Sequence, residues 1–133
     1  MALVIYTDGS CNPNPGAGGW AYVIPSLGIE KSGAEPDTTN NRMELRAVIE
    51  ALKASEGEPI VKIFSDSRLA INTISGTWKG KKNLDLIEEG RKLCEGRKVF
   101  LRWVKAHNGN PHNERCDYFA GINCRAKIDT PTK

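Results

Sequence analysis

The order in which β-rich and helix-like segments follow one another restricts the fold of this chain more than any other feature. Three β-rich runs come first, at 4–6, 19–28 and 28–39, whereas the later runs at 60–66 and 98–107 each follow a helix-like segment. Consecutive strands can form an antiparallel meander, and a strand that follows a helix can join the sheet in parallel through a crossover. The sequence therefore predicts an α/β fold with a mixed sheet and helices on its faces.

The helix-like segments are marked by apolar residues at helical spacing and by polar residues that can cap their first turns. Thr39 and Asn40 precede or begin the longest of them, and Ser67 lies at the start of the next. The turn at Leu27 and Gly28 separates the second and third β-rich runs. The predicted helices cover 40–55, 67–76, 84–96 and 112–127.

Length and composition favour one domain over residues 1–133, with a flexible tail at 127–133. The chain contains no run that could span a membrane, and its first strand begins too early to leave room for a signal peptide, so we expect a cytoplasmic protein. None of the four cysteines forms a CxxC pair, and free thiols are expected there. The net charge of +3 is compatible with a nucleic-acid partner but does not require one.

Four acidic residues occupy positions that a shared site would require. Asp8 and Asp66 follow β-rich runs, and Glu44 and Asp117 lie in the first turns of two predicted helices. Any one of them could simply favour a helix dipole or end a strand. Function in open α/β sheets tends to lie at the carboxyl ends of strands, where grouped acids would repel unless a divalent cation neutralised them. Mg²⁺ fits such a set of carboxylates.

Other kinds of site have weaker support in the sequence. The GAGG segment lacks the lysine of a phosphate-binding loop, and no GxSxG motif accompanies any serine. His107, His112, Cys116 and Cys124 could suggest zinc, but the two cysteines are eight residues apart rather than paired. His107 lies in a polar loop near Asp117, where a histidine is suited to carry protons.

Four motifs in the same order give the chain a close resemblance to ribonuclease H type I. They are YTDGSCNPNPGAGGW, TTNNRMEL, FSDS and WVKAHNGNPHNERCDYFA, and the match extends from about Val4 to Ala126. The resemblance implies a ribonuclease H-like fold: a five-stranded mixed sheet, three antiparallel strands then two parallel, flanked by helices on both faces. It also implies an endonuclease that hydrolyses the RNA strand of RNA–DNA hybrids.

By the same resemblance, Asp8, Glu44, Asp66 and Asp117 match the metal-binding carboxylates and His107 matches a mobile catalytic histidine. The implied mechanism uses two Mg²⁺ ions about 4 Å apart, with Mn²⁺ as a substitute. One ion would activate water and the other would stabilise the departing 3′-oxygen, leaving 5′-phosphate and 3′-hydroxyl ends. The enzyme is expected to be a monomer and not to bind a membrane.

The resemblance also implies which residues face the hybrid, although helix capping and loop hydrogen bonds could explain the same polar residues. The loop from Cys11 to Asn14 would face the RNA together with Glu44, Arg68 and Asn113. Asn40 and Asn41 would lie towards the DNA, and Thr39 and Asn83 near a DNA phosphate.

Two features depart from the family pattern. Arg68 stands where many relatives carry a neutral residue, and the segment between the second and third predicted helices, SGTWKGKKN, is too short for the basic protrusion that many bacterial relatives have. We therefore expect a form without the protrusion, in which Trp78, Lys79, Lys81 and Lys82 contact the substrate. The same lysines could instead only keep a surface turn solvated.

Two other functions remain open at this point. The chain could be a related nuclease that acts on double-stranded RNA, or a hybrid-binding module without activity. The presence of all four acids argues against the inactive module.

Overall fold

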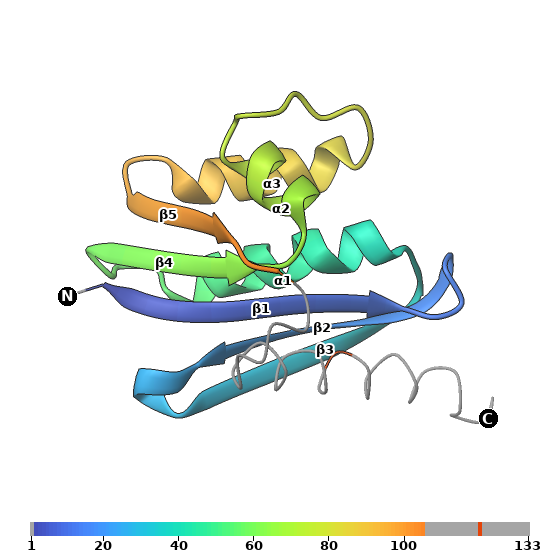
Figure 1. Ribbon diagram of the computed structural model, residues 1–133, viewed down its shortest axis with the longest axis horizontal. Coiled ribbons are helices and arrows are strands. Elements are labelled where there is room, and N and C mark those ends of the chain that lie inside the picture. Colours follow the sequence, from blue (N-terminus) through green and yellow to red (C-terminus); the bar gives the residue numbers. More distant parts are fainter. Residues whose placement is uncertain (1, 106–119, 121–133) are drawn as a thin grey trace.

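A five-stranded sheet with the order β3-β2-β1-β4-β5 forms the centre of the computed structural model (Figure 1), which describes residues 2–105 and Ala120. The strands are β1 Leu3–Cys11, β2 Gly16–Ile24, β3 Ile29–Thr38, β4 Ile60–Ser65 and β5 Lys98–Trp103. The helices are α1 Asn40–Ala54, α2 Arg68–Ile74 and α3 Leu84–Cys94, with a short 3₁₀ turn η1 at Pro25–Leu27.

The strands pair in the directions predicted from the sequence. β2 pairs with β1 and with β3 in antiparallel fashion, whereas β4 pairs in parallel with both β1 and β5. The helix between β1–β3 and β4 and the two helices between β4 and β5 make the crossovers that parallel pairing requires. The predicted mixed sheet, three antiparallel strands followed by two parallel ones, is confirmed.

The first hairpin is longer than expected. The first two β-rich runs were expected at 4–6 and 19–28 with a turn-rich loop between them, and this is wrong outside 12–15, because β1 continues to Cys11 and β2 already begins at Gly16. Pairing with β2 extends β1 beyond Tyr6, where its pairing with β4 ends. Asp8 therefore lies within a strand but just past the parallel part of the sheet. β3 occupies nearly all of the run expected at 28–39 and pairs with nearly all of β2.

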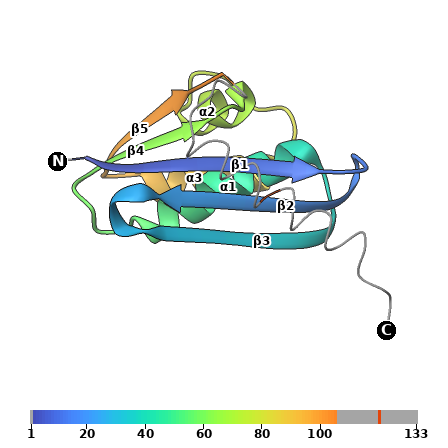
Figure 2. The ribbon, with the colours of Figure 1, turned by 60° about the horizontal axis from the view of Figure 1, so that its bottom comes forward.

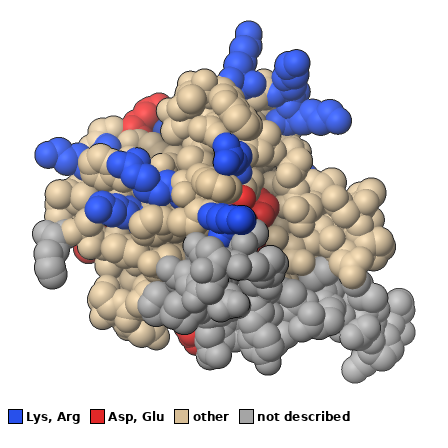
Figure 3. All heavy atoms as spheres, viewed as in Figure 1, with Lys and Arg blue, Asp and Glu red and all other residues tan. Residues whose placement is uncertain are grey.

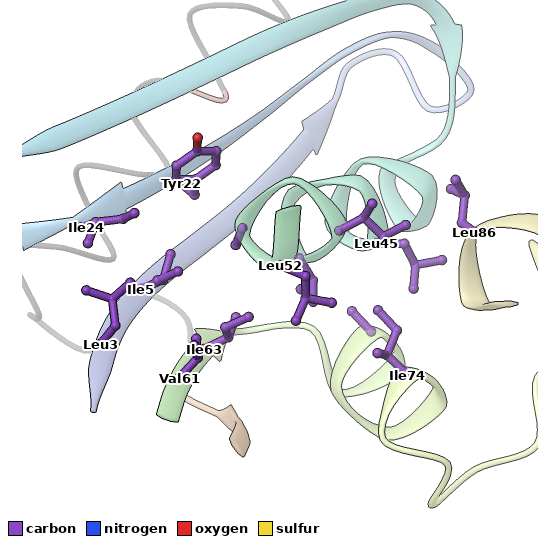
Figure 4. Packing of buried hydrophobic residues seen from close by; sticks show 14 of the residues in the cluster. Leu3, Ile5, Tyr22, Ile24, Leu45, Leu52, Val61, Ile63, Ile74 and Leu86 are labelled. Atoms are coloured by element: carbon purple, nitrogen blue, oxygen red, sulfur yellow. The ribbon is translucent and has the colours of Figure 1, made fainter. Parts of the chain in front are cut away.

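The main core lies between the sheet and the three described helices (Figures 2 and 4). Ile5 and Ile63 from the sheet and Leu45 and Leu52 from α1 are fully buried there. On the other face of the sheet, Ala120 is fully buried in a smaller cluster. That cluster consists of Ala21, Val23 and Ala120, with Tyr6 packed against it.

Two of the predicted helix starts are confirmed by their caps. The Thr39 hydroxyl accepts a hydrogen bond from the amide of Arg42, and the Ser67 hydroxyl accepts one from the amide of Ala70. The predicted helix at 112–127 and the tail at 127–133 lie outside the described residues, apart from Ala120. No helix within residues 2–105 is long and apolar enough to cross a membrane.

Arg97 joins the carboxyl ends of α1 and α3. Its guanidinium donates to the carbonyls of Leu52, Ser55 and Leu93 at 2.9–3.1 Å and to the Ser55 hydroxyl at 3.0 Å. The last carbonyls of a helix have no partner within the helix, so a buried helix end needs such donors. One side chain thereby provides hydrogen-bond donors for carbonyls at the carboxyl ends of both α1 and α3.

We expect Arg97→Met to lower the free energy of unfolding by about 1–3 kcal/mol, because buried carbonyls lose charged donors. Urea denaturation measures the change. Lys92→Met is the control, since the Lys92 ammonium pairs with Glu88 at 3.6 Å and both side chains are 70% exposed. The control should change stability by no more than about 0.5 kcal/mol. Equal effects of the two substitutions would contradict the structural role of Arg97.

Candidate metal centre

Three acidic side chains meet at one end of the sheet, where β1, β4 and α1 approach one another. Asp8 comes from β1, Glu44 from the first turns of α1, and Asp66 follows directly after β4. One carboxylate oxygen from each lies within 4.8 Å of the other two. The convergence expected of these three acids is therefore present in the structure.

The backbone amide of Gly9 holds two of the acids in place. It donates to Asp8 Oδ1 at 2.9 Å and to Glu44 Oε1 at 2.8 Å. The chain has no room for a side chain here, because a Cβ on Gly9 would overlap the backbone of Met43 and Glu44. Glycine therefore allows β1 to touch the first turn of α1, and this contact fixes the distance between Asp8 and Glu44.

Asp66 is positioned by its backbone. The indole Nε1 of Trp103, at the end of β5, donates to the Asp66 carbonyl at 3.0 Å, and the guanidinium of Arg68 lies 4.0 Å from the centre of the Trp103 ring. The Ser65 hydroxyl accepts from the amide of Ser67 at 3.0 Å and shapes the turn between β4 and α2. The backbone of Asp66 is thus held by Trp103 through its carbonyl and by the turn that follows β4.

The electrostatics of the cluster favour a bound cation. Burial raises the pKa of Glu44 well above its ordinary value, and the charges of Asp8 and Asp66 raise it further. Asp66 Oδ1 is buried and has no hydrogen-bond partner among the described residues. A buried carboxylate oxygen without a donor is costly, and a hard divalent cation that prefers oxygen ligands would relieve both this cost and the repulsion. The donor set therefore fits Mg²⁺ or Mn²⁺.

Several predicted site residues lie outside the described part of the chain. They include the fourth carboxylate, Asp117, the histidine His107 and the substrate residue Asn113. The residues of the alternative zinc set, His107, His112, Cys116 and Cys124, lie there as well. Their roles stay predictions.

Half of the residues predicted to face the substrate line one groove of about 330 Å³ beside the loop between α2 and α3. Figure 3 shows Lys and Arg side chains projecting from this loop at the top of the molecule. The predicted residues in the groove are Asn41, Trp78, Lys79, Lys81, Lys82 and Asn83. The loop, residues 75–83, contains no helix or strand.

The other predicted substrate residues that the structure describes lie on or beside the elements that carry the acids, at the end of β1, at the start of α1 and, for Arg68, at the start of α2. Asn14 Oδ1 accepts from the amide of Asn40 at 3.0 Å, which ties the loop after β1 to the start of α1 beside Thr39. The thiol of Cys11 is buried among the carbonyls of Pro13, Gly16 and Thr38. A contact of Cys11 with substrate would therefore involve its backbone.

Sequence reasoning missed two residues that position the acids, Gly9 and Trp103. For Gly9 the signal was its place directly after the candidate ligand Asp8. For Trp103 there was none, since its contact with Asp66 depends on the parallel register that pairs Ser65 with Trp103.

The raised pKa of Glu44 predicts how the metal-free protein responds to pH. The folded state holds the Glu44 proton more tightly than the unfolded state, so its contribution to stability is complete below the ordinary pKa of 4.5 and is lost as pH rises through the raised value. In EDTA, the free energy of unfolding should fall by up to about 1.4 kcal/mol per pH unit in this window. Denaturation at several pH values measures this slope.

Glu44→Gln should flatten that slope and should make the metal-free protein more stable than the wild type at neutral pH. Glu88→Gln is the matched control, because Glu88 is 70% exposed on α3, and it should leave the slope unchanged. If the free energy of unfolding depended on pH identically in the wild type and in Glu44→Gln, Glu44 would not bind a proton more tightly in the folded state.

The chain is similar to known ribonucleases over most of its length. The family model described as RNase H matches residues 1–125. A ribonuclease H from Campylobacter jejuni is 48% identical over 128 residues, covering 89% of this chain and 88% of the relative. A ribonuclease H from Cupriavidus necator is 41% identical over 133 residues and covers 89% of this chain and 92% of its own.

A solved structure shows the same fold. It is the N-terminal RNase H domain of a Mycobacterium tuberculosis protein, determined as a fusion with maltose binding protein. The match has a TM-score of 0.83 and 25% sequence identity, and it covers 97% of this chain and 99% of that one. With the extent of the sequence match and the three converging acids, these likenesses show that the chain belongs to the RNase H family of ribonucleases.

Proposed function

We propose that this ribonuclease hydrolyses the RNA strand of RNA–DNA hybrids at a centre of two Mg²⁺ ions, and that it leaves 5′-phosphate and 3′-hydroxyl ends. The observation that carries the proposal is the convergence of one carboxylate oxygen each from Asp8, Glu44 and Asp66 within 4.8 Å, with Asp66 Oδ1 buried and without a hydrogen-bond partner in the described part of the chain. Asp117 would complete the set of ligands, and Mn²⁺ would substitute for Mg²⁺. The family match supports the hybrid as substrate.

Bound divalent cations would neutralise the carboxylates, orient the scissile phosphate and supply an activated water. The chain's own residues would provide the geometry. Gly9 keeps Asp8 and Glu44 turned towards each other, and Trp103 fixes the backbone of Asp66. His107 would carry a proton to or from the reacting groups, a role that histidine can fill near neutral pH.

The hybrid would lie across the start of α1, between the acids and the groove beside the loop at 75–83. Hybrid recognition requires contacts to both strands across a shallow minor groove. Asn14 is hydrogen-bonded to the first residue of α1, Asn40, and Asn41 lines the groove with the lysines of the loop. This arrangement supports RNA contacts by the loop that follows β1 and DNA contacts by the start of α1 and the groove.

Asp66→Asn should reduce cleavage of a labelled hybrid below detection, because it removes a charge that the cations require while keeping the side-chain volume. Binding of the hybrid in Ca²⁺ should stay within about threefold of the wild type, a change of about 0.7 kcal/mol. The assay compares hybrid, double-stranded RNA and double-stranded DNA in Mg²⁺ and in Mn²⁺. End analysis of the product identifies the 5′-phosphate.

Glu58→Gln is the control, since Glu58 is an exposed acid in the turn before β4 and should leave turnover unchanged. Near-normal turnover of Asp66→Asn would remove Asp66 from the site. Preferential cleavage of double-stranded RNA by the wild type would favour the related nuclease instead. Binding without cleavage of any duplex would favour the inactive module.

Replacing Lys79, Lys81 and Lys82 by Ala tests the groove. Each phosphate neutralised adds nearly one unit to the slope of log affinity against log salt, so the slope should flatten by up to about three units. KM for the hybrid should rise much more than kcat falls, because the groove is separate from the acids. Hybrid binding in Ca²⁺ across a salt series measures the slope.

The charge-matched control replaces Lys31, Lys53 and Lys92, which do not line the groove. It should leave the salt slope almost unchanged. Equal slopes for the wild type and the groove variant would show that the loop at 75–83 does not touch the substrate.

A further inference from the structure

A row of aromatic and basic side chains crosses the sheet on the face opposite α1, α2 and α3. Tyr6 stacks on Phe64, with ring centres 5.1 Å apart, and the Arg102 guanidinium lies 5.2 Å from the centre of the Phe100 ring. The register pairs Tyr6 with Phe64 and Phe64 with Arg102. The row therefore runs continuously from β1 through β4 to β5.

The part of this face that belongs to β4 and β5 is basic and open. Strand alternation places Lys62 and Lys98 on the same face as Phe100, since Val61, Ile63, Val99 and Leu101 turn towards the core. We call Lys62, Phe64, Lys98, Phe100 and Arg102 the β5 platform. Lys62, Lys98 and Arg102 are exposed, and Phe100 is 38% exposed. Figure 3 shows Lys and Arg side chains gathered over β4 and β5.

The platform adjoins the acidic cluster. Asp8 follows Tyr6 by two residues, and Asp66 follows Phe64 by two residues. Because side chains along a strand alternate with a period of two, Asp8 lies on the same side of β1 as Tyr6, and Asp66 directly follows the end of β4 beyond Phe64. A polyanion held at the acids would therefore have an attractive, cationic surface next to it.

We propose that the β5 platform binds single-stranded nucleic acid, namely unpaired RNA or DNA that continues from a hybrid held at the acidic cluster. Aromatic rings and guanidinium planes stack on bases of any sequence, and neighbouring cations contact the phosphates. Phe64, Phe100 and Arg102 supply the stacking surfaces, and Lys62 and Lys98 supply the charge. The proposal rests on the proposed function for the origin of the unpaired strand.

An acidic peptide would match the charge of the platform but would not explain its place beside a phosphate-cleaving site. The observations therefore favour nucleic acid. RNA and DNA overhangs share the chemistry that the platform would recognise, and the experiment below compares both.

The first measurement uses fluorescence anisotropy of labelled single-stranded DNA and RNA 12-mers in EDTA, where no cleavage takes place. Phe100→Leu/Arg102→Gln should bind at least about fivefold more weakly than the wild type, since loss of one base stack costs that much or more. Lys62→Gln/Lys98→Gln should flatten the salt slope by about 1.4 units, the value for two phosphates on a single strand. The control Leu27→Ala/Lys31→Ala, at exposed positions near the β2–β3 turn, should behave as the wild type.

The second measurement compares cleavage of a blunt hybrid with cleavage of hybrids that carry RNA or DNA overhangs. The wild type should have a lower KM for one class of overhang, and Phe100→Leu/Arg102→Gln should lose this advantage while it cleaves the blunt hybrid normally. A wild type that cleaves no hybrid but binds the 12-mers through the platform would overturn the proposed function alone.

Two outcomes would overturn the proposal that the β5 platform binds single-stranded nucleic acid. In the first, both platform variants bind the 12-mers as tightly as the wild type while thermal unfolding shows that they are folded. In the second, the variants lose binding of an acidic, phenylalanine-containing peptide but keep their affinity for the 12-mers.

Discussion

The contact between β1 and the first turn of α1 determines where the acidic residues lie. At this contact the Gly9 amide faces two carboxylates, and the absence of a side chain allows the two backbones to touch. A strand and a helix with ordinary side chains between them would lie farther apart, and Asp8 and Glu44 could not then share one donor. The third acid joins them because β4 pairs in parallel with β1 and ends beside the same contact.

The grouping of acids that a metal site requires lowers the stability of the metal-free protein. Buried carboxylates that lie close together destabilise a metal-free protein, and burial already shifts the pKa of Glu44 upwards. The rest of the fold stabilises this arrangement through the apolar core between the sheet and α1–α3 and through helix ends closed by Thr39, Ser67 and Arg97. A cation that binds only the folded state would raise the free energy of unfolding by mass action.

Much of the fold could be predicted from the sequence, because local patterns determine it. The strand and helix order, the caps at Thr39 and Ser67, and the acids at Asp8, Glu44 and Asp66 all follow from residues near one another in the chain. The extent of the first hairpin could not be predicted, since Asn, Pro and Gly at 12–16 resemble a long loop unless the pairing is known. The role of Trp103 and the β5 platform depend on the register between β4 and β5, which no local pattern specifies.

The central claim, that Asp8, Glu44 and Asp66 hold divalent cations, is tested most directly by nuclear magnetic resonance with Mn²⁺ as a paramagnetic probe. Mn²⁺ broadens amide signals steeply with decreasing distance, so substoichiometric additions report the site of tightest binding. The account predicts that the signals of Gly9, Glu44 and Ser67 broaden first and that excess Mg²⁺ restores them. Broadening that begins at exposed acids such as Asp85 and Glu88, with Gly9 unaffected, would contradict it.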